Sequence, residues 1–310
     1  MYTEFYGLRK TPFDLTPDPF FFSPTARHYE ALASLWYGLQ QRKGFVVITG
    51  EVGTGKTLVL RCLLQALQRE QAQFSYVFNP RLNTEEFFRY ITADFGIRAP
   101  RAQSKSELLW ELNRWLMALH NSGTMAVLLV DEAHLLEWEI LEEIRLLTNL
   151  ETTQHKLLQI VLSGQPELEA KLDSPDLRQL KQRIAFRTKL LPLTPSETRD
   201  YIWNRLRRAG VNGPECLFPE GVCGFIHGWS GGLPRLVNSI CDKALIHGFA
   251  EQARAITPEM IDEIAEEYGL GSGDEQPGER VSFGSSPSTG TMPRGRTGAV
   301  SRFPNTRRKG

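Results

Sequence analysis

The chain has 310 residues, with 36 basic and 36 acidic side chains that give a formal net charge of zero, and 41% of its residues are hydrophobic. This composition is that of a globular protein, and the length favours about two domains. It excludes a uniformly basic nucleic-acid coat protein. No apolar run reaches the ~20 residues of a membrane-spanning helix, and the N-terminal residues lack the apolar stretch of a secretory signal. We therefore expect no transmembrane segment.

The four cysteines are scattered, without a Cys-x-x-Cys pair or a histidine at zinc-finger spacing, so we expect no zinc site and reduced thiols. The charge is unevenly distributed along the chain. Residues 271–310 hold seven basic and three acidic residues, a net charge of +4, which leaves −4 for residues 1–270. This end is rich in Gly, Ser, Pro and Thr and poor in apolar residues. We expect a disordered basic tail over 270–310.

The N-terminal region, 1–43, begins with a proline-punctuated aromatic stretch that disfavours a regular helix. A helix is expected near 24–41, where apolar residues recur at i, i+3, i+4 and i+7. Short apolar runs predict buried strands. The expected strands are 45–49, 74–79, 126–131, 157–163 and 186–191, and the expected helices between them are 56–70, 84–95, 105–120 and 138–152. Strands alternating with helices predict a parallel α/β core over 44–194.

The pattern becomes purely helical after Pro192. The expected helices are 195–209, 219–228, 233–249 and 257–268. Ser196 and Thr257 are the expected N-caps, because small hydroxyl side chains accept the free N–H groups of a first helical turn. We therefore expect a small all-helical domain over 195–269.

A phosphate-binding motif follows the first strand. The segment Gly50–Thr57 fits G-x-x-x-x-G-K-[ST] between a strand and a helix, which is the context that this motif requires. Glycines let successive N–H groups face phosphate oxygens, Lys56 can reach the β- and γ-phosphates, and Thr57 can supply a hydroxyl to Mg²⁺. The expected nucleotide-binding residues are Gly50, Glu51, Val52, Gly53, Thr54, Gly55, Lys56, Thr57 and Leu58.

A second motif completes the expected ATP site. An apolar strand at 126–130 ends in Asp131 and Glu132. Asp131 is expected to join Thr57 in holding Mg²⁺, and Glu132 to orient the attacking water, because phosphoryl transfer depends on positioning and charge compensation. The adjacent His134 is expected to have a surface or capping role. These residues predict ATP hydrolysis to ADP and phosphate.

Together the motifs resemble those of the AAA+ ATPases, and more narrowly the ExeA (general secretion pathway protein A) group. The strings that carry the narrower likeness are FYGLRKTPFDLTPDPFFF, GFVVITGEVGTGKT, LLVDEAHLL, LQIVLSGQPEL, LKQRIAF and SGGLPRLVNSICDKAL, spread over residues 5–247. The resemblance implies a P-loop parallel sheet sandwiched by helices, followed by a small helical lid. In ExeA-type proteins a membrane helix and a peptidoglycan-binding domain follow the ATPase, whereas here we expect only the tail.

The resemblance also implies further site residues. Gln165 corresponds best to the polar "sensor 1" after the fourth strand, with capping of the next helix as the alternative. Arg183 lies where the family's arginine acts in the site of a neighbouring subunit, with Arg178 and Arg187 as competitors. Arg235 in Gly-Leu-Pro-Arg matches the lid "sensor 2". For Phe13 and Phe20, packing beside the adenine and plain core packing both stay open.

The resemblance implies an oligomeric ATPase that switches a secretion or exopolysaccharide export system. It looks most like the soluble exosortase-associated relatives, and we expect a homo-oligomer in the cytoplasm, with peripheral contact to the inner face of the membrane and a protein partner in the export machine. The alternative is a DNA-associated regulator of transposition of the TniB/TnsC type. The neutral charge gives DNA binding little support. A nucleotide-gated scaffold without hydrolysis is disfavoured by Glu132.

Overall fold

The computed structural model describes residues 1–269, except residues 17, 22–23, 99–103 and 268. One five-stranded parallel sheet forms the α/β region, in the order β2-β3-β4-β1-β5. The strands are β1 (Phe45–Gly50), β2 (Gln73–Val77), β3 (Ala126–Val130), β4 (Leu158–Gly164) and β5 (Phe186–Leu190). The predicted parallel α/β sheet is confirmed, since all four strand pairs are parallel.

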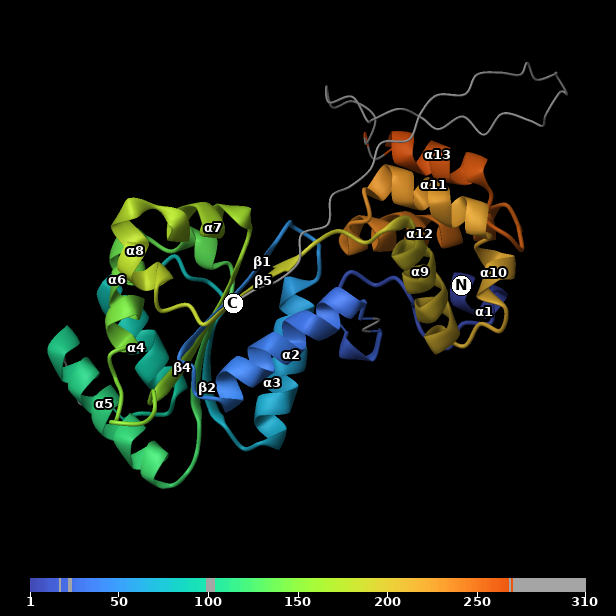
Figure 1. The fold of residues 1–310 in the computed structure, drawn as a ribbon. Helices are drawn as coiled ribbons and strands as arrows, with labels where there is room; N and C mark the ends of the chain where they lie inside the picture. Colours follow the sequence, from blue (N-terminus) through green and yellow to red (C-terminus); the bar gives the residue numbers. More distant parts are fainter. Residues whose placement is uncertain (17, 22–23, 99–103, 268, 270–310) are drawn as a thin grey trace, which may run out of the picture. The chain divides into compact units, whose positions relative to one another are not determined.

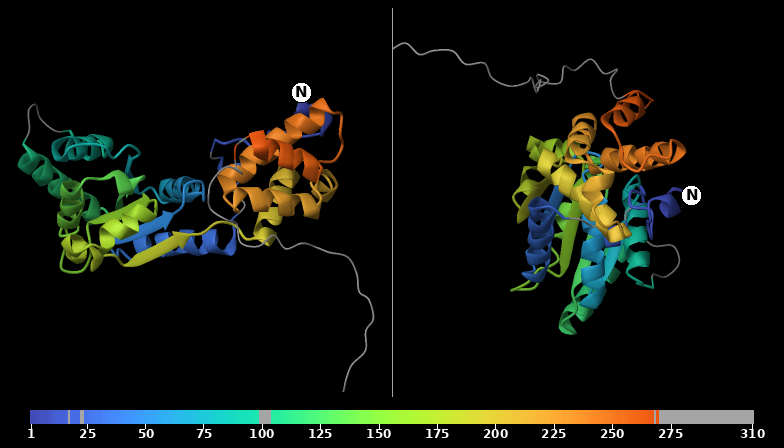
Figure 2. Two further views of the ribbon diagram at one scale, coloured as in Figure 1. Left: turned by 90° about the horizontal axis from the view of Figure 1, so that it is seen from above. Right: turned by 90° about the vertical axis from the view of Figure 1, so that its right-hand side faces the viewer.

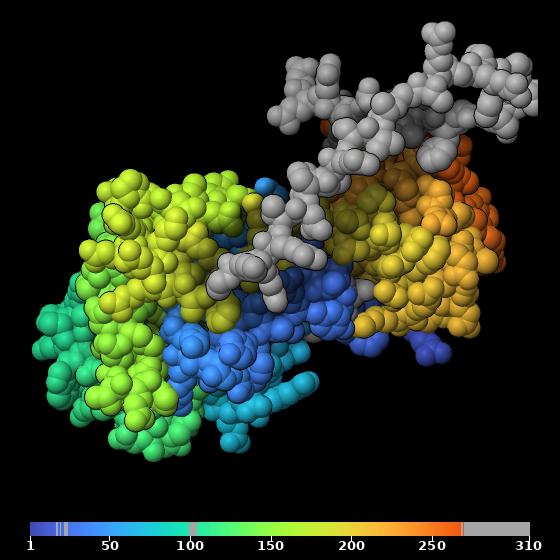
Figure 3. Space-filling view, in the orientation of Figure 1, coloured from blue at the N-terminus to red at the C-terminus, as the bar shows by residue number. Residues whose placement is uncertain are grey.

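Helices cover both faces of this sheet (Figure 1, Figure 2). They are α2 (Ala26–Gln40), α3 (Lys56–Arg69), α4 (Thr84–Asp94), α5 (Lys105–Asn121), α6 (Trp138–Leu147), α7 (Pro166–Asp173) and α8 (Arg178–Lys181), with short 3₁₀ turns η1 (Pro19–Phe21), η2 (Ala133–Leu135) and η3 (Pro175–Leu177). Helices α2 and α3 pack on one face, and α4 to α8 pack on the other. The outer side of α2, blue in the space-filling view, is exposed (Figure 3).

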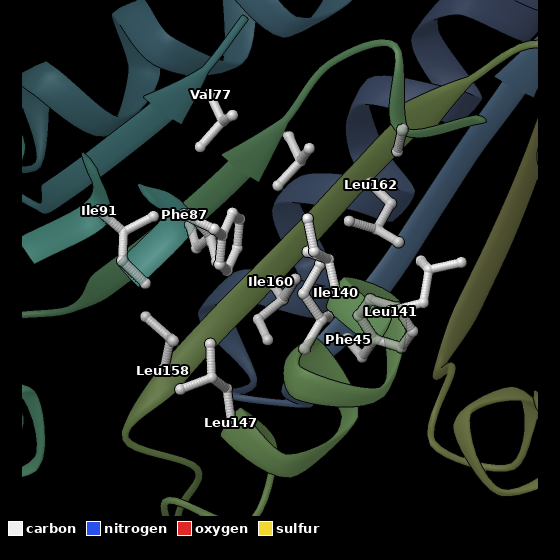
Figure 4. Close-up of a cluster of buried hydrophobic side chains, with 14 of the residues drawn as sticks. Phe45, Val77, Phe87, Ile91, Ile140, Leu141, Leu147, Leu158, Ile160 and Leu162 are labelled. Carbon is white, nitrogen blue, oxygen red and sulfur yellow. The ribbon is translucent and has the colours of Figure 1, made fainter. Parts of the chain in front are cut away.

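Successive strand residues feed two separate cores, because side chains alternate between the faces of a sheet. In β3, Leu128 and Val130 point to the core under α4 to α6, whereas Val127 and Leu129 point to the core under α2 and α3. Figure 4 shows the first of these cores, where strand residues meet Phe87 and other side chains of the covering helices. A strand buried on both faces explains the continuous apolar runs in the sequence.

The second region is helical and has its own core. Its helices are α9 (Pro195–Ala209), α10 (Pro214–Leu217), α11 (Glu220–Ser230), α12 (Pro234–Ala250) and α13 (Pro258–Glu267). The N-terminal residues join this core: α1 (Tyr2–Phe5) contacts α12, and the buried Phe13 packs edge-on against Phe218 with 6.0 Å between ring centroids. Phe20 is instead 47% exposed. The predicted helical lid region is therefore confirmed as a fold, while the proposed domain bounds stay predictions.

Two local predictions about helix ends are wrong, and a third is confirmed. The helix expected at 138–152 ends at Leu147, because the Lys156 ammonium binds the Thr148 carbonyl and the chain turns back. Ser196 is not the cap of α9: Thr194 is, since its side chain accepts from the Glu197 N–H with Pro195 in the first turn. Thr257 does accept from the Met260 N–H, as an N-cap does.

The expected tail at 270–310 lies outside the described residues. Within the described part of the chain, no helix is long and apolar enough to cross a membrane.

Candidate functional site

The site begins at the loop between β1 and α3. Gly53 and Gly55 have φ angles of +84° and +98°, in the left-handed region that side chains disfavour. Gly55 is also the N-cap of α3, so the free N–H groups of the first helical turn face the loop. Such a helix N-terminus favours bound anions such as phosphate.

The lysine of this loop is buried and rests on the loop itself. Lys56 Nζ donates to the carbonyl of Gly50 at 2.7 Å and to that of Glu51 at 3.0 Å. Burial lowers the pKa of Lys56, and the carboxylates of Glu132 and Asp131 act in the opposite direction. The ammonium is therefore largely buried, with acids nearby and only neutral acceptors in direct contact.

Asp131 lies directly after β3 and is buried among four donors. Its Oδ2 accepts from the hydroxyls of Thr57 at 3.1 Å and Tyr76 at 3.2 Å. Its Oδ1 accepts from the Ser163 hydroxyl at 2.8 Å and the Glu132 N–H at 3.0 Å. Burial and the negative charge of Asp131 raise the pKa of Tyr76, which keeps the phenol a donor. A carboxylate beside a hydroxyl is the kind of oxygen pair that Mg²⁺ accepts.

Glu132 has a strained backbone and a partly buried carboxylate. Its φ is +50°, in the left-handed region, which costs about 1–2 kcal/mol for a residue with a side chain. Its Oε2 is buried and lies 3.3 Å from His134 Nδ1, whereas its side chain as a whole is 41% exposed. Strain of this kind is often found where a side chain must be held for function.

A cavity of about 360 Å³ joins these groups to the N-terminal segment and the helical region. It is lined by Asp14, Leu15, Thr16, Asp18, Val52, Gly53, Gly55, Lys56, Thr57, Leu58, Glu132, Tyr201, Arg205, Pro234, Arg235 and Asn238. This volume is in the range of small-molecule sites. The loop lies at the carboxyl end of β1, and parallel α/β sheets bind ligands at that end of their strands.

Arg235 belongs to this cavity. It is exposed and lies in the first turn of α12, and its backbone N–H donates to the Gly53 carbonyl at 3.3 Å. Its backbone thus connects the helical region directly to the phosphate loop.

Gln165 is placed less centrally than the sequence predicts. It occupies the N-cap position of α7 without a side-chain capping bond, and it is absent from the cavity lining among the described residues. Two residues earlier, Ser163 is buried and binds Asp131. The polar group that β4 brings to the acid cluster is therefore the Ser163 hydroxyl.

The candidate arginines after η3 lie outside the cavity lining of the described chain. Arg187 is paired with Asp173 at 2.9 Å. Arg183 is partly buried, and its positive charge contributes to the lowered pKa of Glu151, whose largest cause is Lys156. Arg178 is exposed on α8. Arg187 thus already forms an ion pair within its own chain.

Other residues of the site had no signal in the sequence. Tyr76 reaches Asp131 from β2. His28 reaches the phosphate loop from α2: its Nε2 lies 3.2 Å from the Thr54 carbonyl and its Nδ1 lies 2.8 Å from Thr25 Oγ1. Burial lowers the pKa of His28. Arg205 donates to the Pro12 carbonyl and lines the cavity.

Comparison with known proteins agrees with this fold. A family model described as an AAA domain matches residues 39–172. Cdc6p from Pyrobaculum aerophilum superimposes with a TM-score of 0.64 at 20% identity, covering 83% of this chain and 70% of that chain. The Aeropyrum pernix ORC1 protein in complex with DNA gives a TM-score of 0.57 at 18% identity, covering 84% and 69%. At these identities the two structures show the fold alone.

The P-loop and the paired acids after β3 lie within residues 39–172, which match the AAA domain, and the fold is that of an AAA+ P-loop protein. The chain is similar to general secretion pathway protein A of Aeromonas hydrophila, with 47% identity over 257 residues. The aligned part is 83% of this chain and 46% of that protein, so the chain spans about half the length of this relative.

Proposed function

We propose that the chain binds ATP with Mg²⁺ and hydrolyses it to ADP and phosphate. One observation carries this proposal: a buried amine, a hydroxyl–carboxylate pair and a second carboxylate converge beside an anion-binding loop. They are Lys56, Thr57, Asp131 and Glu132. The loop 50–58 supplies the backbone N–H groups for the phosphates.

Lys56 is poised to exchange its partners. Its present acceptors are neutral carbonyls of Gly50 and Glu51. A hydrogen bond to a charged group contributes about 1.5–3 kcal/mol, against about 0.5–1.5 kcal/mol for a neutral one. Phosphate oxygens therefore compete well for the ammonium, which moves from the loop carbonyls to the β- and γ-phosphates.

Thr57 Oγ1 and Asp131 Oδ2 are the oxygens that would hold the metal ion. A bound Mg²⁺ supplies charge neutralisation to the phosphates. Ser163 and Tyr76 keep the Asp131 carboxylate in place through their hydroxyls.

Glu132 orients and polarises the attacking water from the cavity wall. Arg235 contacts the γ-phosphate from the lid, Gln165 assists after β4, and Arg183 acts in the site of a neighbouring subunit. The planar guanidinium suits both arginine roles, because it donates to two phosphate oxygens and stays charged.

The first test replaces Lys56 and Glu132 separately. Lys56→Ala is expected to abolish ATP binding, measured with a fluorescent ATP analogue. Glu132→Gln is expected to keep ATP binding and lose phosphate release. Lys43→Ala, an exposed lysine outside the cavity lining, is the matched control. Undiminished turnover in Lys56→Ala would overturn the assignment.

We further propose that ATP turnover switches the oligomeric state of this protein in a secretion or exopolysaccharide export system. The support is the likeness to general secretion pathway protein A, which favours this function over a DNA-associated transposition regulator. The protein then works as a homo-oligomer in the cytoplasm, at the inner face of the membrane, with a protein of the export machine as its partner.

Mixing inactive variants tests the shared site. Arg183→Ala subunits keep an intact Glu132, and Glu132→Gln subunits keep an intact Arg183. Mixed oligomers therefore contain some complete sites, and phosphate release should return on mixing. Arg187→Ala is the control, because that side chain is paired with Asp173. A mixture that stays inactive would assign Arg183 a structural role.

A further inference from the structure

One oxygen of the Glu132 carboxylate, Oε2, is buried and has no hydrogen-bond partner among the described residues. A buried acceptor without a donor is unfavourable. The group facing this oxygen is the imidazole of His134, with Nδ1 at 3.3 Å but not aligned as a hydrogen bond.

A surface or capping role was expected for His134, and its side chain is only 12% exposed. Its backbone is fixed from outside the nucleotide cavity. Lys171 Nζ donates to the His134 carbonyl at 2.6 Å and to the Leu136 carbonyl at 3.0 Å. The backbone that carries the imidazole is therefore anchored to α7.

The same nitrogen faces a second partner. The backbone N–H of Gln165 points at His134 Nδ1 from 3.5 Å. A ring nitrogen either carries a proton and donates, or is bare and accepts. Nδ1 can therefore bind Glu132 with its proton or Gln165 with its lone pair, one at a time. The two long distances fit a ring shared between both partners.

We propose that His134 is a positioning residue for hydrolysis: its Nδ1–H holds Glu132 Oε2, so that the remaining carboxylate oxygen faces the nucleotide cavity. When His134 Nδ1 instead accepts from the Gln165 N–H, the Glu132 carboxylate is released and can rotate. The imidazole, whose backbone is anchored by Lys171, thus determines the fraction of time that the Glu132 carboxylate is oriented toward the cavity. The inference rests on the proposed ATPase function and adds a residue to that site.

The decisive experiment measures ATP turnover and ATP affinity separately in His134→Ala and His134→Asn. The Asn amide nitrogen occupies about the position of Nδ1 and donates a hydrogen bond. His134→Ala should lose about tenfold in kcat with ATP affinity within twofold, because binding residues are untouched. His134→Asn should keep most of the wild-type kcat.

One further variant makes the result specific. His247→Ala is the matched control: His247 lies on α12 and outside the cavity lining, and its Nε2 is 3.3 Å from a carboxylate oxygen of Glu251. It should leave kcat unchanged.

The outcomes separate clearly. An unchanged kcat in His134→Ala overturns the proposal. Equal losses in the Ala and Asn variants, or a parallel loss of ATP affinity, overturn it in favour of a structural role. Absence of turnover in the unaltered protein contradicts the ATPase function itself, which is a different result.

Discussion

Replacing Ser163 with alanine tests whether Asp131 depends on donors beyond the two sequence motifs. The Ser163 hydroxyl donates to Asp131 Oδ1 at 2.8 Å in a fully buried position. A hydrogen bond to a charged group contributes about 1.5–3 kcal/mol. Because Asp131 keeps three other donors, we expect the loss to lie at the lower end, about 1.5 kcal/mol.

Two measurements should detect the loss of this hydrogen bond. Urea unfolding should show Ser163→Ala less stable by about 1.5 kcal/mol. The Mg²⁺ concentration for half-maximal ATP turnover should rise about tenfold, since 1.4 kcal/mol is a factor of ten. The carboxylate is then less firmly held for the ion.

Ser75→Ala is the matched control. Ser75 is also a fully buried strand serine, but its hydroxyl has no hydrogen-bond partner among the described residues. Removing an unsatisfied hydroxyl should leave stability equal or higher. If Ser163→Ala unfolds like the wild type, or if Ser75→Ala loses as much, the reasoning about Asp131 fails.

Three more predictions concern the surrounding structure. Arg205→Lys should speed tryptic cleavage of the N-terminal segment, because Lys lacks the fork that now binds the Pro12 carbonyl and the Tyr201 hydroxyl; equal cleavage rates would contradict this. Burial lowers the pKa of His28, so the unfolded state takes up a proton at higher pH than the folded state, and the free energy of unfolding should fall as the pH drops below about 6.5. His28→Asn should make this pH dependence flatter in urea unfolding across pH 5–8, and an unchanged slope would contradict the argument. Cys216 is exposed, whereas burial raises the pKa of Cys223 to about 12. In the folded protein a thiol reagent at pH 8 should therefore label Cys216 well before Cys223. Peptide mapping that finds the opposite order would refute the burial argument.

The parts of the site that follow local sequence rules could be predicted. The phosphate loop and the two acids are set by contiguous residues between a strand and a helix, so spacing alone identifies them. The strand positions also follow from short apolar runs, and each observed strand lies within two residues of its expected ends.

The remaining groups reach the site from distant parts of the chain. Tyr76 contacts Asp131 across 55 positions, and His28 contacts Thr54 across 26. No local pattern marks a tyrosine in a strand or a histidine in a helix as a neighbour of this loop. The end of α6 was missed for a similar reason, because a lysine beyond the helix binds its last turn.

The cap of α9 does follow a local sequence rule. Thr194 precedes Pro195, and proline favours the first helical position, so the residue before the proline is the N-cap rather than Ser196.

The N-terminal segment shares a core with the helical region, which has a consequence for truncation of the chain. Leu8, Phe13 and Phe21 pack among helical-region side chains, while Asp14 and Asp18 line the cavity. The wall that the N-terminal segment contributes to the cavity is therefore held by the same hydrophobic core as the helices. A deletion of the first twenty residues would remove that wall and expose apolar side chains of the helical core at once.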